Sequence, residues 1–300
     1  MTPAEPLDLV ADSAERLAVL LGAGLPAAVA WRQLAATQPD DATLALAADA
    51  AQEGRSIAGS LRSAKHVNSG TAAWSAVCCG IEISERTGAP LVPVLTGLSG
   101  ALREQAQARR DVETALTGPR LSARLVLALP VVGMGFAFLL GANPLVALLS
   151  SPAGLVCLTT GLALLLCGAL WSRRLVRRAE PPPGLVGLEE DLVAMAVTAG
   201  APVGHALDLV GSVLARPQDR AGSPAIEAAV RLATGAGVPV AGLLSGEARL
   251  QRRRAATEAR RRAEALAVLL LIPLGACILP SFLLLGVAPL LLSLVSSTVL

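Results

Sequence analysis

Polar and apolar segments alternate twice along this chain. Two long stretches, 125–172 and 265–300, contain no Asp, Glu, Lys, Arg or His, and each follows a basic segment with helical spacing. About 20 apolar residues in a helix cross the hydrocarbon of a bilayer. The pattern therefore predicts a membrane protein in which a polar block and an apolar block occur in tandem.

The first uncharged stretch has 48 residues, which suits two spans joined by a turn. Glycine, proline, serine and asparagine cluster at 141–154, and this cluster separates a predicted span at 121–140 from another at 155–171. The second stretch has 36 residues, and it suits one span at 264–285. We predict three spans. The pattern leaves open whether 286–300 is a fourth crossing or a segment on the outer face.

Arginines stand before the first span, after the second and before the third. They are Arg120, Arg124, Arg173, Arg174, Arg177, Arg178, Arg249, Arg252, Arg253, Arg254, Arg260, Arg261 and Arg262. Basic flanks are retained in the cytoplasm, so we expect the N-terminus and both polar blocks there and the turn outside. Asp8, Asp12 and Glu15 follow the first residues, a pattern unlike the cationic start of a signal peptide, and none is expected.

Composition agrees with a membrane class. Hydrophobic residues make up 53% of the chain, charged residues 16%, and the mean hydropathy is +0.60. The net charge is +2, and the arginines behind it are explained by topology. The few aromatic residues are not interleaved with the basic runs, which disfavours nucleic-acid binding.

The N-terminal block has the spacing of antiparallel helices. Apolar residues recur every three or four positions from Leu7 to Leu21. Gly24 then suits the position after a helix, where a left-handed backbone is required, and Pro26 suits the first turn of the next helix. The sequence thus predicts an all-α membrane protein with two cytoplasmic antiparallel helical-bundle domains, each followed by transmembrane helices.

The Gly-x-Pro device returns at 88–90, 200–202, 222–224 and 237–239. Segment 20–26 is similar in sequence to 196–202, and segment 88–95 is similar to 237–244. Each copy then continues as a charged helix, predicted at Leu95–Leu116 and Leu244–Glu264. We interpret this as an internal repeat whose second copy is a helix or two shorter. The predicted domains are a cytoplasmic helical domain at 1–120, a transmembrane hairpin at 121–172, a shortened second cytoplasmic domain at 173–263 and a C-terminal transmembrane segment at 264–300.

The order of these motifs resembles a known family. The chain combines an apolar-x-x-Gly-x-Pro turn, the element Glu85-Arg86-Thr87-Gly88 before a long basic helix, and a proline-bearing span. This order is duplicated once, and the second copy departs from it at Ala233-Thr234-Gly235, which lacks the glutamate. This looks like the F-type inner-membrane platform protein of type II secretion systems, type IV pili and the tight-adherence (Flp) pilus. The segments 141–145 and 271–284 look most like the tight-adherence paralogues of actinobacteria.

The resemblance implies a non-enzymatic scaffold in the cytoplasmic membrane. It implies contacts with a hexameric secretion ATPase, with the transmembrane segments of a pilin or pseudopilin, with membrane lipid, and with further copies or a paired platform paralogue. The residues assigned to partner binding are Glu85, Arg249, Arg252, Arg253 and Arg254. For the arginine helix 249–262, the alternative is that it fixes topology and lies along anionic headgroups.

Candidate catalytic chemistry is sparse. His66 and His205 are the only histidines, and adjacent Cys78 and Cys79 lack the spacing of a zinc ligand pair. Glu82 and Glu85 lack the histidine of a carboxylate di-metal motif, and the chain has no phosphate-binding glycine loop. We therefore predict no catalytic residue, metal or cofactor.

A polytopic transporter is the alternative of a different class. Carriers usually place charged or titratable groups inside the bilayer, because these groups bind or relay the transported charge. The interiors of the two uncharged stretches hold only small polar groups such as Asn143, Thr159, Thr160 and Ser281. This composition favours the scaffold over the transporter.

Overall fold

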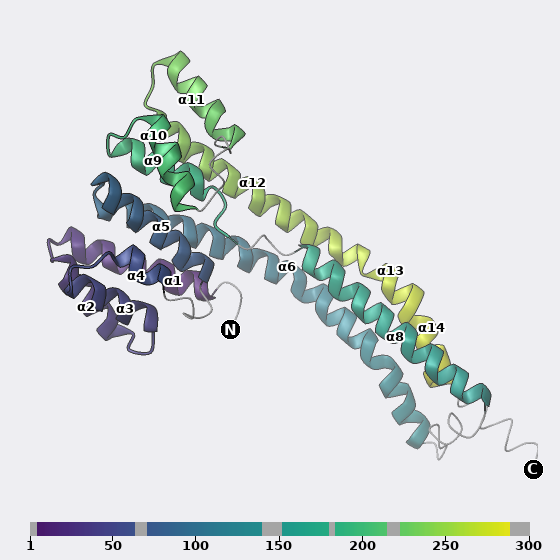
Figure 1. The fold of residues 1–300 in the computed structure, drawn as a ribbon. Coiled ribbons are helices and arrows are strands. Elements are labelled where there is room, and N and C mark those ends of the chain that lie inside the picture. Colours follow the sequence, from purple (N-terminus) through teal and green to yellow (C-terminus); the bar gives the residue numbers. More distant parts are fainter. Residues whose placement is uncertain (1–4, 64–70, 140–151, 180–183, 215–222, 289–300) are drawn as a thin grey trace, which may run out of the picture. The chain divides into compact units, whose positions relative to one another are not determined.

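The computed structural model describes residues 5–63, 71–139, 152–179, 184–214 and 223–288, and within these ranges the chain is helical and has no strand (Figure 1). This confirms the predicted all-α class. The helices are α1 Glu5–Gly22, α2 Ala27–Thr37, α3 Ala42–Gln52, α4 Ile57–Ser63, α5 Thr71–Thr87, α6 Leu91–Leu139, α8 Pro152–Ala179, α9 Leu188–Thr198, α10 Val203–Val213, α11 Pro224–Ala236, α12 Val240–Leu269, α13 Leu271–Pro273, η1 Leu274–Ile278, α14 Leu279–Phe282 and η2 Leu283–Val287.

Several predictions fall outside the described residues. These are the turn at 141–151, the segment beyond 288, and His66. Most side chains of 119–137 also lie outside the description, although the backbone there is helical.

The chain divides into two compact units. Unit 1 comprises Met1–Arg110 with Pro181–Thr257, and unit 2 comprises Asp111–Glu180 with Glu258–Leu300. Each unit therefore takes segments from both halves of the sequence, and helices α6 and α12 belong to both units.

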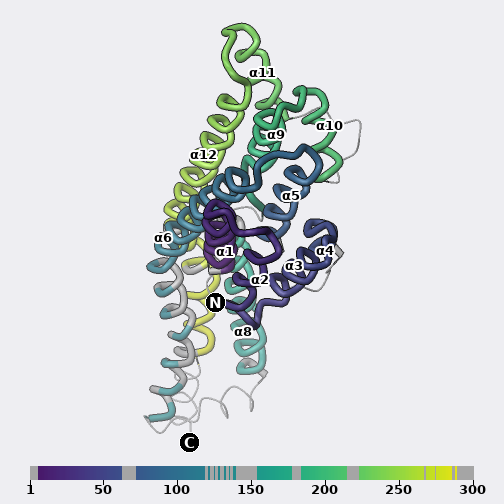
Figure 2. The backbone as a smooth tube through the Cα atoms, turned by 90° about the vertical axis from the view of Figure 1, so that its left-hand side faces the viewer, coloured from purple at the N-terminus to yellow at the C-terminus, as the bar shows by residue number. Residues whose placement is uncertain are grey.

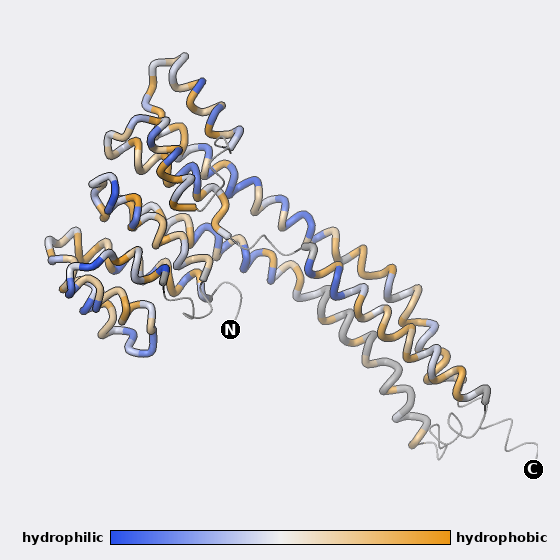
Figure 3. Tube along the Cα trace, in the orientation of Figure 1, coloured by the Kyte–Doolittle hydropathy of each residue, from blue (hydrophilic) through white to orange (hydrophobic). Residues whose placement is uncertain are grey.

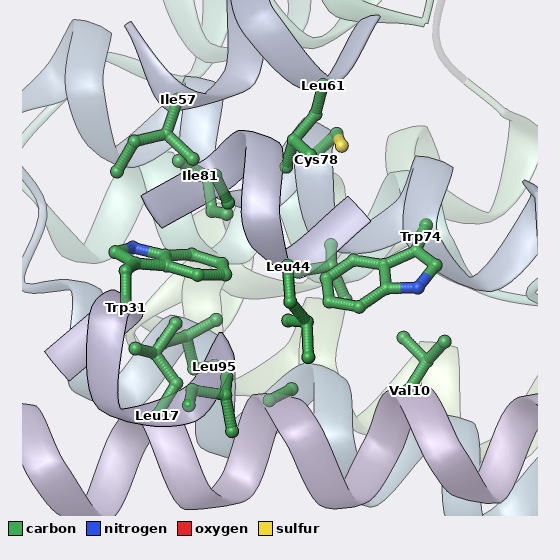
Figure 4. Close-up of a cluster of buried hydrophobic side chains, with 14 of the residues drawn as sticks. Val10, Leu17, Trp31, Leu44, Ile57, Leu61, Trp74, Cys78, Ile81 and Leu95 are labelled. Carbon is green, nitrogen blue, oxygen red and sulfur yellow. The ribbon is translucent and has the colours of Figure 1, made fainter. Parts of the chain in front are cut away.

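The first core of unit 1 lies among α1 to α5 and the start of α6. Trp31, Leu44 and Leu17 are almost fully buried there and meet Ile81 of α5 and Leu95 of α6 (Figure 4). The apolar stripe predicted from Leu7 to Leu21 is the face of α1 that points into this core. Burying such large side chains contributes roughly 1.5–3 kcal/mol each and holds the helices together.

The second core of unit 1 gathers α9, α10, α11 and the start of α12. It also contains Cys79 and Ile83 of α5, so that α5 packs on the first helices with one face and on α9 and α10 with another (Figure 2). A small adjoining cluster joins Val94 and Leu98 of α6 to Met195 of α9. The two polar blocks thus share one continuous apolar interior.

Two helix turns have the same geometry. Gly24 has φ +88°, and the amide of Leu25 donates to the Leu20 carbonyl at 3.2 Å. Gly200 has φ +96°, and the amide of Ala201 donates to the Ala196 carbonyl at 3.1 Å. Both are Schellman endings, in which a left-handed residue satisfies the last carbonyls of a helix.

The proline that follows each turn stands one position earlier than the sequence predicts. Pro26 and Pro202 are N-cap residues with ψ of 143° and 144°, not residues of the first turn. The extended ψ lets the chain leave the turn before the helix begins, and proline tolerates it because its fixed φ suits both conformations.

Unit 2 packs α6, α8 and the helical segments after Glu258. Leu116, Ala263 and Leu266 are buried in its core, against Leu175 and Val176 of α8. Further along, α8 packs against α13, η1, α14 and η2. The Ser281 hydroxyl donates to the Gly161 carbonyl at 2.9 Å in this contact. The π-helical turns η1 and η2 lie in the segment that carries Pro273 and Pro280, where prolines remove backbone donors.

Two helices among the described residues are long and apolar enough to cross a membrane. They are Gly154–Arg177 and Val240–Leu285, and the hydropathy colouring changes from hydrophilic to hydrophobic along the second (Figure 3). These correspond to the second and third predicted spans. The first predicted span, 121–140, lies in α6 up to Leu139, and most of its side chains are outside the described part of the chain.

Candidate functional site

A groove of about 510 Å³ opens in unit 1 between α6, α9 and α12. Most of its lining side chains are small: Thr96, Gly97, Gly100, Ala101, Ala194 and Ser245. Arg249 and Arg252 of α12 form the basic part of the lining. Small side chains let another backbone approach closely. The lining also contains the acids Glu104 and Asp191, which both pair with Arg252, so the groove carries charges of both signs. The groove therefore has room for the close approach of another helix or strand.

Arg252 anchors the groove by an ion pair that is nearly closed to solvent. Its Nη1 donates to Asp191 Oδ2 at 2.6 Å, and its Nε donates to Glu104 Oε2 at 2.7 Å. The Arg252 side chain is only 9% exposed and that of Asp191 only 12%. Burial raises the pKa of Asp191, against the opposing effect of the Arg252 charge. For Arg252, burial lowers the pKa, but the two carboxylates outweigh it and the net shift is upward.

A second buried carboxylate lies beside this pair. Glu190 is 3% exposed and accepts hydrogen bonds from Ser223 Oγ at 2.7 Å and from Gln251 Nε2 at 3.0 Å. Ser223 also caps α11, since its Oγ accepts from the Ile226 amide. Glu190 thus ties α9 to the start of α11 and to α12, which fixes one wall of the groove.

The predicted partner-binding arginines have different environments. Arg252 is committed to an internal ion pair, whereas Arg249, Arg253 and Arg254 are exposed on α12. Arg249 lines the same groove as Arg252, and its Nε donates to the Ser245 carbonyl of its own helix at 3.3 Å. Three of the four arginines are therefore accessible to a partner, and Arg252 shapes the surface that presents them.

Glu85, the remaining predicted residue, lies on α5 and not in the groove. Its carboxylate accepts from Ser56 Oγ at 2.8 Å and from the Ile57 amide at 3.1 Å. These contacts cap the N-terminus of α4 and join it to the end of α5. These hydrogen bonds give Glu85 a structural role at this helix junction, and partner binding by Glu85 stays a prediction.

An ion pair on the other side of unit 1 has the same plan as Arg252 with Asp191. Arg103 of α6 pairs with Glu15 of α1 and donates from Nη2 to Asp12 Oδ1 at 2.9 Å. These hydrogen bonds raise the pKa of Arg103. In each case an arginine of a long helix pairs with a carboxylate on the helix that precedes a Gly-x-Pro turn.

The remaining titratable side chains of the described residues form no further candidate site. No group of three histidine, cysteine or acidic side chains there is placed to hold a metal ion. Burial raises the pKa of Cys78 to about 12 and also raises that of Cys79, so both thiols stay protonated at neutral pH. Glu82 pairs with Arg62 and with Arg86, the latter at 2.8 Å.

Sequence reasoning missed Asp191, Glu104 and Glu190. The acidic run 189–191 at the start of a predicted helix is an ordinary N-terminal signal, and nothing in it distinguishes the residue that turns inward. The equivalent placement of Arg103 and Arg252 after two matched Gly-x-Pro turns was the available clue.

The comparison with protein families supports one assignment. No curated protein matches the chain. Residues 13–139, which span most of α1 and continue to the end of α6, match the family model for the type II secretion system (T2SS), protein F.

Proposed function

We propose that this chain is a multi-pass platform protein of the cytoplasmic membrane that serves a type II secretion-like or tight-adherence pilus machine. The match of residues 13–139 to the protein F family carries this proposal. The all-helical unit 1 and the two helices apolar enough to cross a membrane support it. In this role the chain is a scaffold without catalytic activity.

The proposal includes the internal repeat and its topology. Two observations support the repeat: the Gly24 and Gly200 turns share one hydrogen-bond pattern, and Arg103 and Arg252 make corresponding ion pairs. The basic residues of α12 precede the apolar part of the same helix. Retention of these residues on the inner side places both polar blocks in the cytoplasm.

We further propose that unit 1 engages a hexameric secretion ATPase through the basic part of α12. Arg249, Arg253 and Arg254 are exposed beside the groove, and an acidic ATPase surface would complement them. Helices α6 and α12 continue from unit 1 into unit 2 without a break, which suits them to carry a displacement of unit 1 toward the spans. The spans would contact the transmembrane segments of the pilin.

A charge-reversal experiment tests the ATPase contact. In Arg249→Glu/Arg254→Glu, unit 1 keeps its buried Arg252 pair, and we expect co-purification with the ATPase from native membranes to fall at least about tenfold, as for two lost interfacial charge pairs. Arg32→Glu/Arg55→Glu changes the same net charge at exposed sites on and near other helices and is the matched control. Equal retention of the ATPase by both variants would refute docking through α12.

Reconstitution separates the scaffold from a transporter. Proteoliposomes that contain only this chain are expected to show no substrate-dependent flux. A flux that disappears in Thr159→Val or Ser281→Ala would instead identify a transport pathway through the spans.

A further inference from the structure

We propose that unit 1 binds a second copy of this chain head-to-tail, with the α11 surface of one molecule in the α1–α2 groove of the next. The basis is a contact that already exists inside unit 1, where the first polar block covers the second. Because the two blocks are proposed copies of one plan, the same contact is available once more on each molecule, between its unused surfaces.

The internal contact uses one face of α5 and the start of α6. Cys79 and Ile83 are buried with α9 and α10, and Val94 and Leu98 are buried beside Met195. It is polar at its edge, where Arg86 Nη1 donates to Ser212 Oγ at 3.1 Å. We call the surface of the α9–α10 pair the acceptor surface of this contact, and the face of α5 and the start of α6 that covers it the donor surface.

The unused acceptor is the α1–α2 pair. Pairing Gly24 with Gly200 brings α1 and α2 onto α9 and α10, and a groove of about 830 Å³ lies on α1 and α2. Lining residues of this groove are Arg16, Val19, Leu20, Leu25, Leu34 and Thr37. Their counterparts are Leu192, Met195, Ala196, Ala201, Val210 and Val213, all of which belong to the covered second core. In the groove, by contrast, Val19 is 65% exposed.

The unused donor is α11 with the turn that follows it. Pairing Gly88 with Gly237, both at positive φ, places Leu232 where Ile83 stands and Val238 where Ala89 stands. Ile83 is fully buried, whereas Leu232 is 61% exposed and Val238 is 44% exposed. Large apolar side chains with such exposure are a typical mark of an unoccupied interface.

Charged residues also stand at matched positions of the two surfaces. On the acceptor, Asp12 and Arg16 stand where the second block has Leu188 and Leu192, and on the donor Glu247 and Arg253 stand where the first block has Leu98 and Glu104. Asp12 already pairs with Arg103 of its own molecule. The apolar residues of the donor are therefore what a second copy brings to the groove.

One molecule cannot satisfy both of its own surfaces. Helix α11 and the α1–α2 pair lie at opposite edges of unit 1, with α5, α9 and α10 between them (Figure 1). The contact joins two different surfaces, so each added copy presents a free acceptor or donor. The association therefore continues beyond two copies until a ring closes or a row ends.

Cysteine crosslinking of the full chain in membranes tests this arrangement. In a background with Cys157→Ala and Cys167→Ala, the more accessible native thiols are removed while the buried ones stay. We expect Val19→Cys alone and Leu232→Cys alone to give no crosslinked dimer with a short bismaleimide. Their mixture should give a dimer, and the double variant should give a ladder of dimers, trimers and larger species.

A dimer from either single variant would show a symmetric contact and would overturn the proposal. So would a double variant that stays monomeric, or a Val19→Cys product that contains a different protein. As a second test, Leu232→Asp should weaken self-association at least about tenfold, as expected when an interface anchor is lost. The control Leu46→Asp, at an exposed leucine of α3, should leave self-association unchanged. Arg253 belongs to both proposed surfaces, but Val19, Leu232, Arg249 and Arg254, the residues changed in the two tests, each belong to one surface only, so failure here is distinct from failure of ATPase docking.

Discussion

Arg252 Nη1 lies 2.6 Å from Asp191 Oδ2, and this nearly solvent-free pair joins α12 to α9 inside unit 1. The half-exposed Glu104 of α6 accepts from the same guanidinium at 2.7 Å. Three helices that are distant in sequence therefore meet at one side chain. The pair sits at the wall of the groove proposed as a docking site, so the stability and the shape of that site depend on it.

Removal of this arginine should destabilise unit 1 strongly. In Arg252→Ala, Asp191 remains buried without its cation, and we expect the free energy of unfolding to fall by about 3 kcal/mol. Urea denaturation of the detergent-solubilised chain, followed by fluorescence of buried Trp31 and Trp74, measures the loss. The exposed Arg254→Ala is the control and should change the same quantity by less than about 0.5 kcal/mol. Equal losses in the two variants would contradict the assigned role.

Alkaline pH should destabilise the fold through Cys78. The pKa of this thiol rises from 9.0 to about 12 in the native state because it is buried, so the unfolded chain loses its proton first. The stabilisation is complete below pH 9 and is lost as pH rises toward 12, at up to about 1.4 kcal/mol per pH unit. The chain has no tyrosine and one lysine, so the other side chains that titrate in this window are mainly the remaining four cysteines, and the pKa of Cys79 is raised as well. The slope of unfolding free energy against pH should be shallower in Cys78→Val; an unchanged slope would contradict the prediction.

The Glu85 cap should control the order of α4. Loss of the carboxylate in Glu85→Ala leaves the Ile57 amide without its acceptor, and we expect a cost of about 1 kcal/mol. Amide hydrogen exchange over 57–63 should accelerate more than exchange in α3. Glu53→Ala removes an exposed acid near the same junction and serves as the control. If both substitutions accelerate exchange in α4 equally, the cap is not the cause.

Glycines of α8 should be sensitive to a single methyl group. A Cβ at Gly161 would lie 2.6 Å from Leu285 Cγ, and one at Gly168 would lie 3.0 Å from Cys277 Cβ. We expect Gly168→Ala to cost about 1–3 kcal/mol, because Cys277 Cβ is held by its backbone, and Gly161→Ala to cost at least as much, because the contact is tighter and Leu285 is buried. Thermal unfolding in detergent measures both.

Gly135 of α6 provides the control, since a Cβ there has no neighbour within 4 Å among the described residues. Gly135→Ala should leave the unfolding temperature unchanged or raise it slightly, because alanine favours the helix. A drop as large as that of Gly168→Ala would show that the loss does not depend on the close helix contacts of α8.

Patterns with local causes were predictable from the sequence. The apolar spacing from Leu7 to Leu21 predicted a buried helix face, and glycine before a proline predicted the left-handed endings at Gly24, Gly88, Gly200 and Gly237. Helical period and backbone chirality act over a few residues, so they can be inferred without tertiary contacts. The long helices extend further than predicted, since α6 begins at Leu91 and α12 at Val240, only one or two residues after the preceding turn.

Patterns with nonlocal causes were not predictable. Arg252 is the same residue type as Arg253 and Arg254, and only the packing of α6 and α9 against α12 distinguishes the buried one. Likewise, the way Ile83 of one block enters the core of the other depends on contacts across more than 100 residues. The spacing of apolar residues identifies the buried face of a helix, but it does not identify which other helix covers that face.

Photo-crosslinking from position 249 in native membranes tests the central claim most directly. A photoreactive amino acid replaces the exposed Arg249, and the same substitution at Arg32 of α2 is the control. The account predicts that products from position 249, identified by mass spectrometry, contain a subunit of the secretion ATPase and that those from position 32 do not. Products that contain only periplasmic or extracellular proteins would place this helix on the wrong side of the membrane and contradict the account.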